Sequence, residues 1–172
     1  MYVQIGSPEN PSDVVDLFLE CHERIRTFIG LAARLAKTED ASPDEVRDAA
    51  ARVARYFSDA LPLHVADEEQ SILPRLAGRS RELDSALDKM NREHREHEQP
   101  LRLLLEACKT LKSSPELLDR VREKLAEAVA GLDTDYAAHL QEEERIILPA
   151  IRTFLTPAQK AEIESELRAR RR

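Results

Sequence analysis

Two histidines are each followed by a glutamate four positions later, in stretches of similar sequence. His64 and Glu68 lie in His-Val-Ala-Asp-Glu-Glu, and His139 and Glu143 lie in His-Leu-Gln-Glu-Glu-Glu. Residues four apart on an α-helix stand on one face, one turn from each other. Each pair can therefore present an imidazole and a carboxylate to the same point.

These stretches belong to a longer internal repeat with an offset of 75 residues. The same offset carries His22 onto His97, and in both halves the first histidine precedes the second by 42 residues. His94, the remaining histidine, has Leu19 at its equivalent position. The repeat predicts two helical hairpins, each with a histidine on its first helix and His-x-x-x-Glu on its second.

Imidazole combined with carboxylate is a donor set that suits iron, manganese or zinc. Because a carboxylate has two oxygens, it can also bridge two ions. The pattern thus predicts a dinuclear metal site in the core of a helical bundle. The predicted metal-binding residues are the five histidines and the two glutamates of the pairs: His22, His64, Glu68, His94, His97, His139 and Glu143.

Non-metal explanations exist for single members of this set. A lone core histidine is more often satisfied by an ordinary hydrogen bond. The same explanation is less satisfactory for four histidines on four different helices, because burying so many imidazoles and carboxylates without partners is costly. His94 stays open between a metal ligand and a pocket residue. Tyr136, one turn before His139, is either a core residue with a paired hydroxyl or part of the pocket lining.

The acidic neighbours of the two glutamates are expected to be solvated, because a run of charges usually forms an exposed helix face. Glu69 and Glu144 each follow the histidine of their pair by five residues, and on a regular helix they point roughly 140° away from it. The acidic residues expected at the surface are Asp67, Glu69, Glu142 and Glu144.

Other reaction classes lack their signatures. The residue three before each histidine is never glutamate, which excludes the Glu-x-x-His di-iron carboxylate bundles. The sequence contains neither the His-Glu-x-x-His of zinc proteases nor the Gly-x-Ser-x-Gly of serine hydrolases. With four glycines in the chain, a Gly-rich phosphate loop is absent and an all-β fold is disfavoured.

Helix caps and breakers divide the chain into helical segments. Ser42-Pro43-Asp44-Glu45 is a capping box with proline at the first helical position, and Ser114-Pro115 and Thr156-Pro157 begin helices in a similar way. Gly78-Arg79-Ser80 separates the second helix from the third. The predicted helices span about 13–37, 43–76, 81–112, 115–151 and 157–169.

The predicted fold is an all-α, up-down-up-down four-helix bundle with a short C-terminal helix. Residues 1–155 are expected to form the bundle domain, and residues 156–172 the C-terminal helix and a basic tail. Pro62 and Pro100 should kink the helices that contain them. The predicted inward stripes alternate steps of three and four: Val15, Phe18, His22, Ile25, Ile29, Ala32 and Ala36; Leu83, Leu87, Met90, His94, His97, Leu101, Leu104, Cys108 and Leu111; Leu118, Leu125, Val129, Leu132, Tyr136, His139, Glu143 and Ile146.

Composition indicates one soluble domain. The 172-residue chain carries a net charge of −7, so nucleic acid is not an expected partner. The basic tail, with arginine at 168 and 170–172, is expected to be a solvated helix end. Cys21 and Cys108 form no Cys-x-x-Cys and are expected to serve in packing, in a reduced compartment.

The N-terminal residues 1–8 lack the basic flank and apolar run of a signal peptide. No apolar stretch approaches the roughly 18 residues that a membrane span needs. We therefore expect a cytoplasmic protein without a membrane partner. The sequence leaves the oligomeric state open, although the terminal helix could mediate a dimer.

The ordered set of histidines and glutamates resembles the hemerythrin-like, or HHE cation-binding, family. The phrases around Leu61-Pro62-Leu63-His64, Ile72-Leu73-Pro74 and Ile147-Leu148-Pro149 look much like the second- and fourth-helix signatures of that family. The resemblance covers about 13–151. It implies a bundle with two non-haem iron ions, Fe²⁺ or Fe³⁺, with an oxo or hydroxo bridge as an option. Glu68 and Glu143 would bridge the irons and the histidines would be terminal ligands.

The resemblance also implies a small ligand as partner: O₂, NO or peroxide. The sequence departs from the oxygen-carrying hemerythrins, which have aspartate at i+5 on the fourth helix and an i,i+4 histidine pair on the third. These departures argue against simple O₂ carriage. Three function classes stay open: binding or sensing of O₂, NO or peroxide; a catalase-like or NO-reducing enzyme; and storage or delivery of iron, or structural binding of another metal.

Overall fold

The computed structural model describes residues 13–172, and all of the regular structure in that range is helical. The N-terminal residues tested for a signal peptide lie outside the described range. The helical elements are α1 (Val14–Lys37), α2 (Pro43–Arg55), η1 (Tyr56–Ala60), α3 (Leu61–Asp67), η2 (Glu68–Ile72), α4 (Leu73–Leu76), α5 (Arg81–Ser113), η3 (Pro115–Leu117), α6 (Leu118–Glu142), η4 (Glu143–Ile147), α7 (Leu148–Phe154) and α8 (Pro157–Arg170).

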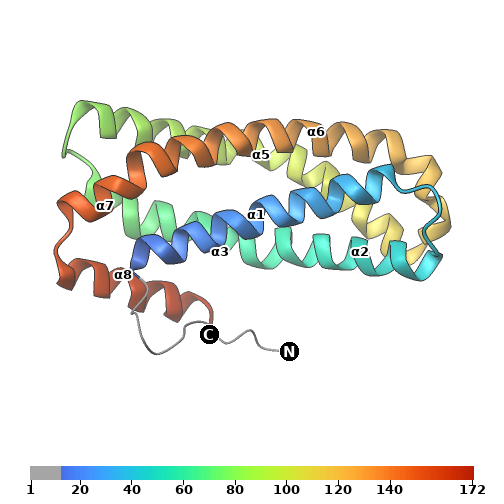
Figure 1. Cartoon of the computed structure of the whole chain (residues 1–172), viewed down its shortest axis with the longest axis horizontal. Coiled ribbons are helices and arrows are strands. Elements are labelled where there is room, and N and C mark those ends of the chain that lie inside the picture. Colours follow the sequence, from blue (N-terminus) through green and yellow to red (C-terminus); the bar gives the residue numbers. More distant parts are fainter. Residues whose placement is uncertain (1–12) are drawn as a thin grey trace.

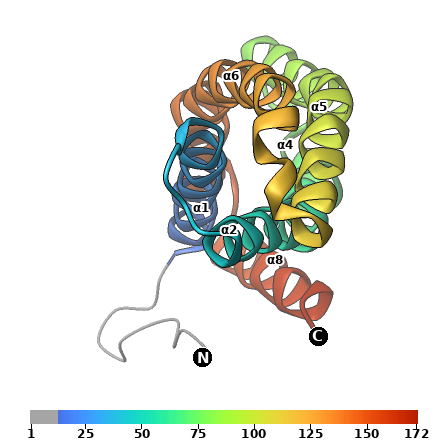
Figure 2. The same cartoon turned by 90° about the vertical axis from the view of Figure 1, so that its right-hand side faces the viewer.

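Several of these elements follow one another without a break. We call residues 43–76, from α2 to α4, segment 2, and residues 115–154, from η3 to α7, segment 4. In Figure 1, α1, segment 2, α5 and segment 4 run back and forth along the long axis. Figure 2 shows them around a common interior, with α8 outside. The expectation of an all-helical fold is confirmed for the described part of the chain.

The predicted caps form at the starts of α2 and α8. The Ser42 side chain accepts a hydrogen bond from the Glu45 backbone N–H, and Glu45 reaches back to the Ser42 N–H at 2.8 Å. Thr156 and Gln159 form the same reciprocal pair. Between segment 2 and α5, Gly78 adopts a φ of 80°, a left-handed conformation that other residues rarely adopt. These local signals explain why the predicted helix bounds agree closely with the structure.

In the described residues 13–172, three π-helical turns, η1, η2 and η4, interrupt the α-helical hydrogen bonding, and each ends just before a Leu-Pro dipeptide. The N–H of Leu61, Leu73 and Leu148 donates to the carbonyl five residues earlier. Proline lacks an N–H and crowds the turn before it, which the wider turn relieves. The expected kink at Pro62 thus takes the form of a π-turn, whereas α5 is continuous through Pro100.

The π-turn η4 changes which face of segment 4 is buried. Its extra residue rotates the helix, so that Ile147 is buried where the regular stripe predicted Ile146. Leu101 of α5 is likewise only partly buried. The other residues of the predicted stripes are all buried.

Two apolar clusters fill the bundle, one toward each end. One contains Ile25, Leu104 and Leu132, and the other contains Phe18 and Ile151. On α1, segment 2, α5 and segment 4 alike, the chain passes from one cluster to the other near the predicted site histidines. The polar residues of the site therefore form a layer across the middle of an otherwise apolar core.

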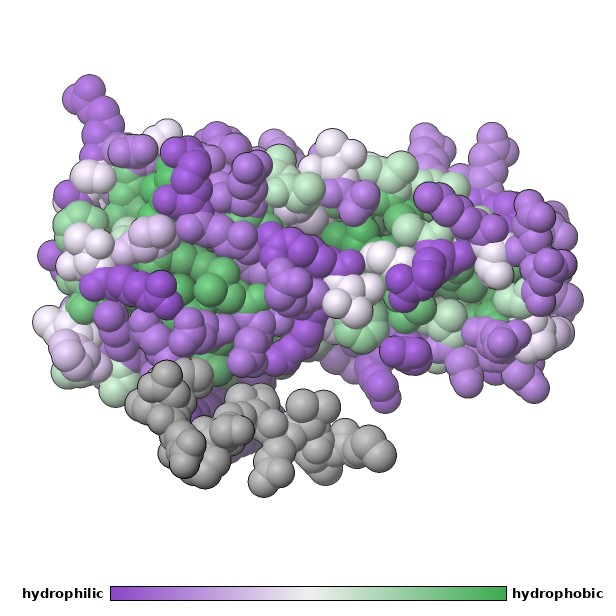
Figure 3. All heavy atoms as spheres, in the orientation of Figure 1, coloured by the Kyte–Doolittle hydropathy of each residue, from purple (hydrophilic) through white to green (hydrophobic). Residues whose placement is uncertain are grey.

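The face of the molecule in Figure 3 is mostly polar, with patches of apolar residues among the polar ones. The terminal helix α8 packs on the bundle, with Ile163 and Leu167 buried. These apolar side chains are covered by the same chain, so they give no support to a dimer through α8. Within residues 13–172, no helix combines the length and apolar character needed to span a membrane.

Burial predicts opposite outcomes for two adjacent leucines of α5. Leu104 is fully buried in the larger cluster, and Leu103 is 48% exposed. We expect Leu104→Ala to lower the free energy of unfolding by about 2–5 kcal/mol, because it leaves a cavity. Leu103→Ala, the control, should change it by less than about 0.5 kcal/mol. Urea unfolding of the two variants measures both values, and equal losses would contradict the core assignment.

Candidate metal centre

The structure brings six of the seven predicted metal-binding residues into two overlapping groups. His22, His64, Glu68 and Glu143 form one group, and Glu68, His94, His139 and Glu143 form the other. Within each group, one ligand atom from every residue lies within 4.8 Å of the others. Glu68 and Glu143 belong to both groups, which is the arrangement expected of carboxylates that serve two ions.

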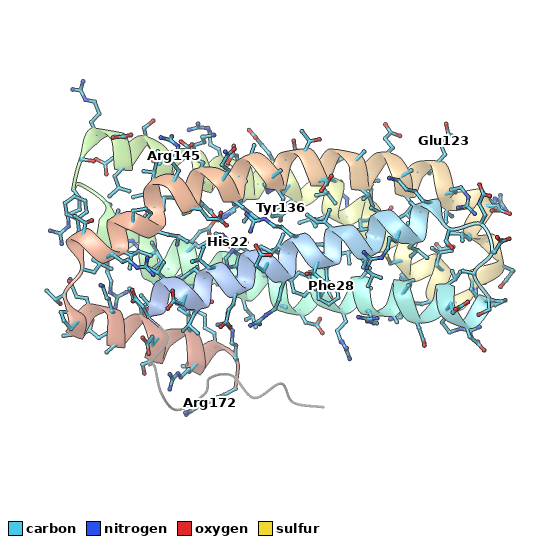
Figure 4. All side chains as sticks on the ribbon, in the orientation of Figure 1. His22, Phe28, Glu123, Tyr136, Arg145 and Arg172 are labelled. Atoms are coloured by element: carbon cyan, nitrogen blue, oxygen red, sulfur yellow. The ribbon has the colours of Figure 1, made fainter. Side chains whose placement is uncertain are left out.

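Each contributing side chain comes from a different part of the bundle. His22 projects from α1 and is fully buried; Figure 4 labels its position on that helix. His64 lies three residues before the end of α3, and Glu68 is the first residue of η2. His139 and Glu143 hold the equivalent positions in α6 and η4. All of the predicted metal-binding residues are at most 8% exposed.

Many polar atoms in the two groups have no hydrogen-bond partner. They include Nε2 of His22, His64 and His94, and both carboxylate oxygens of Glu143. His64 Nε2 lies 3.1 Å from Glu68, and His22 Nε2 lies 3.3 Å from Glu143, yet the alignment for hydrogen bonds is missing. Buried polar atoms are rarely left unpaired. Nitrogen and oxygen atoms that converge in this way without hydrogen-bond partners are suited to bind a metal cation.

Three of the histidines are oriented by a second carboxylate on their Nδ1 side. His22 Nδ1 lies 2.9 Å from Glu144. His94 Nδ1 lies at the same distance from Glu69, and His139 Nδ1 at the same distance from Glu93. Such contacts fix the ring and direct Nε2 toward a metal.

The prediction that Glu69 and Glu144 are solvated was only partly right: their side chains are 36% and 30% exposed, but each also contacts a histidine. Each contacts a histidine on a neighbouring helix, His94 for Glu69 and His22 for Glu144. Arg26 also contacts Glu144, at 2.8 Å. These contacts were missed because the prediction treated each helix alone.

The structure does not bring His97 into either group, although it is 3% exposed. Its ring centroid lies 4.4 Å from that of Tyr136 and 5.1 Å from that of His139. Burial, and then the charge of His139, lower the pKa of His97 to about 4. His97 is therefore a neutral residue beside the centre.

His94 takes the place that the repeat had given to His97. His94 shares a group with His139, and its Nδ1 contacts Glu69. In the same way, His22 shares a group with His64, and its Nδ1 contacts Glu144. Three residues on an α-helix turn through about 300°, so His94 and His97 point in directions about 60° apart. Only one of them can face the shared carboxylates in the way that His22 does.

Electrostatic effects keep the two shared carboxylates ionised. Burial opposes the charge on Glu68, but the charge of His64 and contacts with neighbouring histidines hold its pKa well below the usual value. For Glu143, burial and repulsion by Glu68 raise the pKa. Contacts with His139 and His22 outweigh both effects and hold the pKa below its usual value.

The histidines respond in the opposite sense. Burial lowers the pKa of His22, but the adjacent Glu143 and Glu68 outweigh it and raise the pKa to about 9. For His139, burial is likewise outweighed by Glu143, and the pKa rises to about 9. Without a metal, protons on these rings thus balance the charge of the carboxylates, and binding of a cation must displace them.

His64 has a thiol neighbour, Cys21, in place of a second carboxylate. Burial raises the pKa of Cys21, but contact with His64 outweighs it and the pKa is lowered. Cys108 is fully buried in the apolar cluster, and burial raises its pKa to about 12, as expected of a packing residue. Tyr136 is buried, and burial together with the charges of the two glutamates raises its pKa.

Asp67 and the basic tail also differ from the sequence prediction. Asp67 is fully buried, and Arg170 and Arg171 pair with its two oxygens. These arginines are thus not simply a solvated helix end. A signal for Asp67 was present, because it lies three residues after His64 and therefore on the same helix face.

The sequence comparison agrees with this geometry. A profile described as the hemerythrin HHE cation binding domain matches residues 13–151. The chain belongs to this family. The two groups of buried histidines and glutamates in this hemerythrin domain are compatible with metal binding. No significant match was found among curated proteins.

The raised pKa values predict how the metal-free hemerythrin domain responds to pH. Protonation of His22 and His139 stabilises the folded state fully below pH 6.5, and this stabilisation is lost as the pH rises toward 9. A net loss of about 2 kcal/mol would lower the Tm by roughly 4–8 °C. Thermal melts with a chelator at pH 6.5 and 9.5 measure the change.

The double variant His22→Gln, His139→Gln is the control for that measurement. It lacks two of the four histidines whose pKa is raised, the others being His64 and His94, so its Tm should vary less over the same range. A Tm of the parent protein that stays constant or rises from pH 6.5 to 9.5 would contradict the charge balance described above.

Proposed function

We propose that the chain is a non-haem di-iron protein that binds or senses O₂, NO or peroxide, with the up-down-up-down bundle of its family. The observation that carries this proposal is the sharing of Glu68 and Glu143 by two groups of buried ligands. Two carboxylates with two oxygens each can serve two ions at once. A single-ion site would need only one of the groups.

The donor set supports iron. Each group offers two imidazoles and two carboxylates, a mixture of nitrogen and oxygen that suits iron and manganese. Cysteine, which is common in structural zinc sites and in iron–sulfur clusters, contributes to neither group. His97 is the residue of the predicted set that we place beside the ions rather than on them.

Bound iron would supply redox chemistry and open coordination positions for a small oxidant or NO. The chain's own residues determine what reaches that position. The site lies in a layer between two apolar clusters, which exclude bulk water and favour small, weakly polar ligands. His97 and Tyr136, buried in mutual contact, line the His139 side.

Binding and catalysis could both use this site. A catalase-like or NO-reducing enzyme needs the same ions but must also release a product. Turnover of peroxide or NO by the iron-loaded protein would identify an enzyme. Iron storage would instead require more than two ions for each chain, which the two groups do not offer.

Removing either shared carboxylate should reduce the metal content. We expect Glu68→Ala and Glu143→Ala each to lower the iron bound from two to one or fewer ions for each chain, because each glutamate belongs to both groups. Elemental analysis of protein purified from iron-supplemented cells, with circular dichroism to confirm folding, measures this.

Glu142→Ala is the matched control, because Glu142 precedes Glu143 but belongs to neither group and pairs with Arg145 of its own segment. It should bind as much iron as the parent protein. If both test variants keep two ions, the shared-carboxylate assignment is wrong.

A further inference from the structure

The C-terminal helix α8 lies outside the residues that match the family. It packs against the first two helical segments of the bundle, α1 and segment 2. It contacts α3, η2 and α1 (Figures 1 and 2). Ile163 and Leu167 complete the apolar cluster at that end. A helix that only closed this cluster would need no polar contacts to the site-bearing turn. The polar contacts of α8 are concentrated there.

The first contact is an ion pair at the residue next to a shared carboxylate. Asp67 immediately precedes Glu68 and is fully buried. Arg170 Nη1 donates to one oxygen of Asp67 at 2.8 Å, and Arg171 donates to the other. A buried carboxylate needs such partners, and here α8 provides them.

Two further contacts continue along the same face of segment 2. Arg170 Nη2 also lies 2.9 Å from the Ser71 hydroxyl, and Glu166 accepts a hydrogen bond from that hydroxyl. Arg75 donates to Glu166 at 2.7 Å and to the Ser71 carbonyl at 2.9 Å. Asp67, Ser71 and Arg75 are four residues apart in turn, so α8 is fastened on both sides of the π-turn η2.

Within residues 13–172, the second hairpin, α5 and segment 4, has no such polar contacts with α8. The offset of 75 residues places Glu142, Ile146 and Ala150 opposite Asp67, Ser71 and Arg75. Glu142 pairs with Arg145 of its own segment. The ionic contacts to α8 therefore add to the asymmetry of a largely repeated site, in which His64 already has Cys21 where His139 has Glu93.

We propose that α8 is a one-sided clamp on the metal centre. Asp67 acts as a positioning residue, through which Arg170 and Arg171 hold η2, and with it Glu68, in place. The clamp slows the loss of metal, and its opening frees the side of the site formed by Cys21 and His64, near Arg171. This inference rests on the proposed metal centre, and the test below separates the two.

The test compares two double variants of the full-length chain. Arg170→Gln, Arg171→Gln removes the clamp. Arg168→Gln, Arg172→Gln removes the same charge from the same helix end, where Arg168 pairs with Glu164 within α8. In iron-loaded protein mixed with excess chelator, we expect the first variant to release iron at least 10-fold faster than the parent. The control should stay within twofold of the parent.

Amide hydrogen exchange gives a readout that needs no metal. In metal-free protein, loss of the clamp should speed exchange at least 10-fold in residues 64–76 and leave residues 139–151 within twofold of the parent. A merely structural role for α8 would instead loosen both halves alike. Equal release rates for the two double variants, or equal exchange in both halves, would overturn the proposal.

Asp67→Asn keeps the test informative if the clamp variant does not fold. It leaves a neutral side chain where the clamp variant leaves a buried charge, and it should show the same faster release and local exchange. If the parent protein binds no iron, the metal centre fails, and exchange in residues 64–76 still decides whether α8 is a clamp.

Discussion

Two ionised carboxylates lie close together in the dry middle of the bundle, and the rest of the structure accommodates them. Glu68 and Glu143 are at most 3% exposed and repel each other. Burial of such a pair is costly unless cations or protonated groups surround it. The four histidines of the two groups provide that surrounding, and a pair of metal ions would provide it more completely.

The backbone is shaped around this layer. Each shared glutamate is the first residue of a π-helical turn that ends before a Leu-Pro dipeptide. The same short stretch of sequence thus contains both the carboxylate and the proline that accompanies the wider turn. Outside the groups, Glu69, Glu93 and Glu144 orient the histidines across helix boundaries. The halves are thus similar at the centre, and they differ in the neighbours of His64 and His139 and in the contacts of Asp67 with α8.

Local sequence signals predicted much of this arrangement. Capping boxes and prolines located the helices, and the i,i+4 spacing identified Glu68 and Glu143, because these signals depend on one helix at a time. Contacts between helices were missed for the opposite reason. Nothing in the sequence around Glu69 or Arg170 indicates which neighbouring helix it faces. The choice of His94 over His97 depended on helix rotation, which the alignment of the repeat did not contain.

The most direct test of a shared-carboxylate di-iron centre is the metal content of the purified protein, measured together with its visible spectrum. The account predicts two irons for each chain and absorption that changes when O₂ or peroxide is added to the reduced protein. A single zinc ion with no colour would contradict it and indicate a structural metal site. A protein that folds fully and binds no metal would leave the unpartnered atoms of His22, His64 and Glu143 without an explanation.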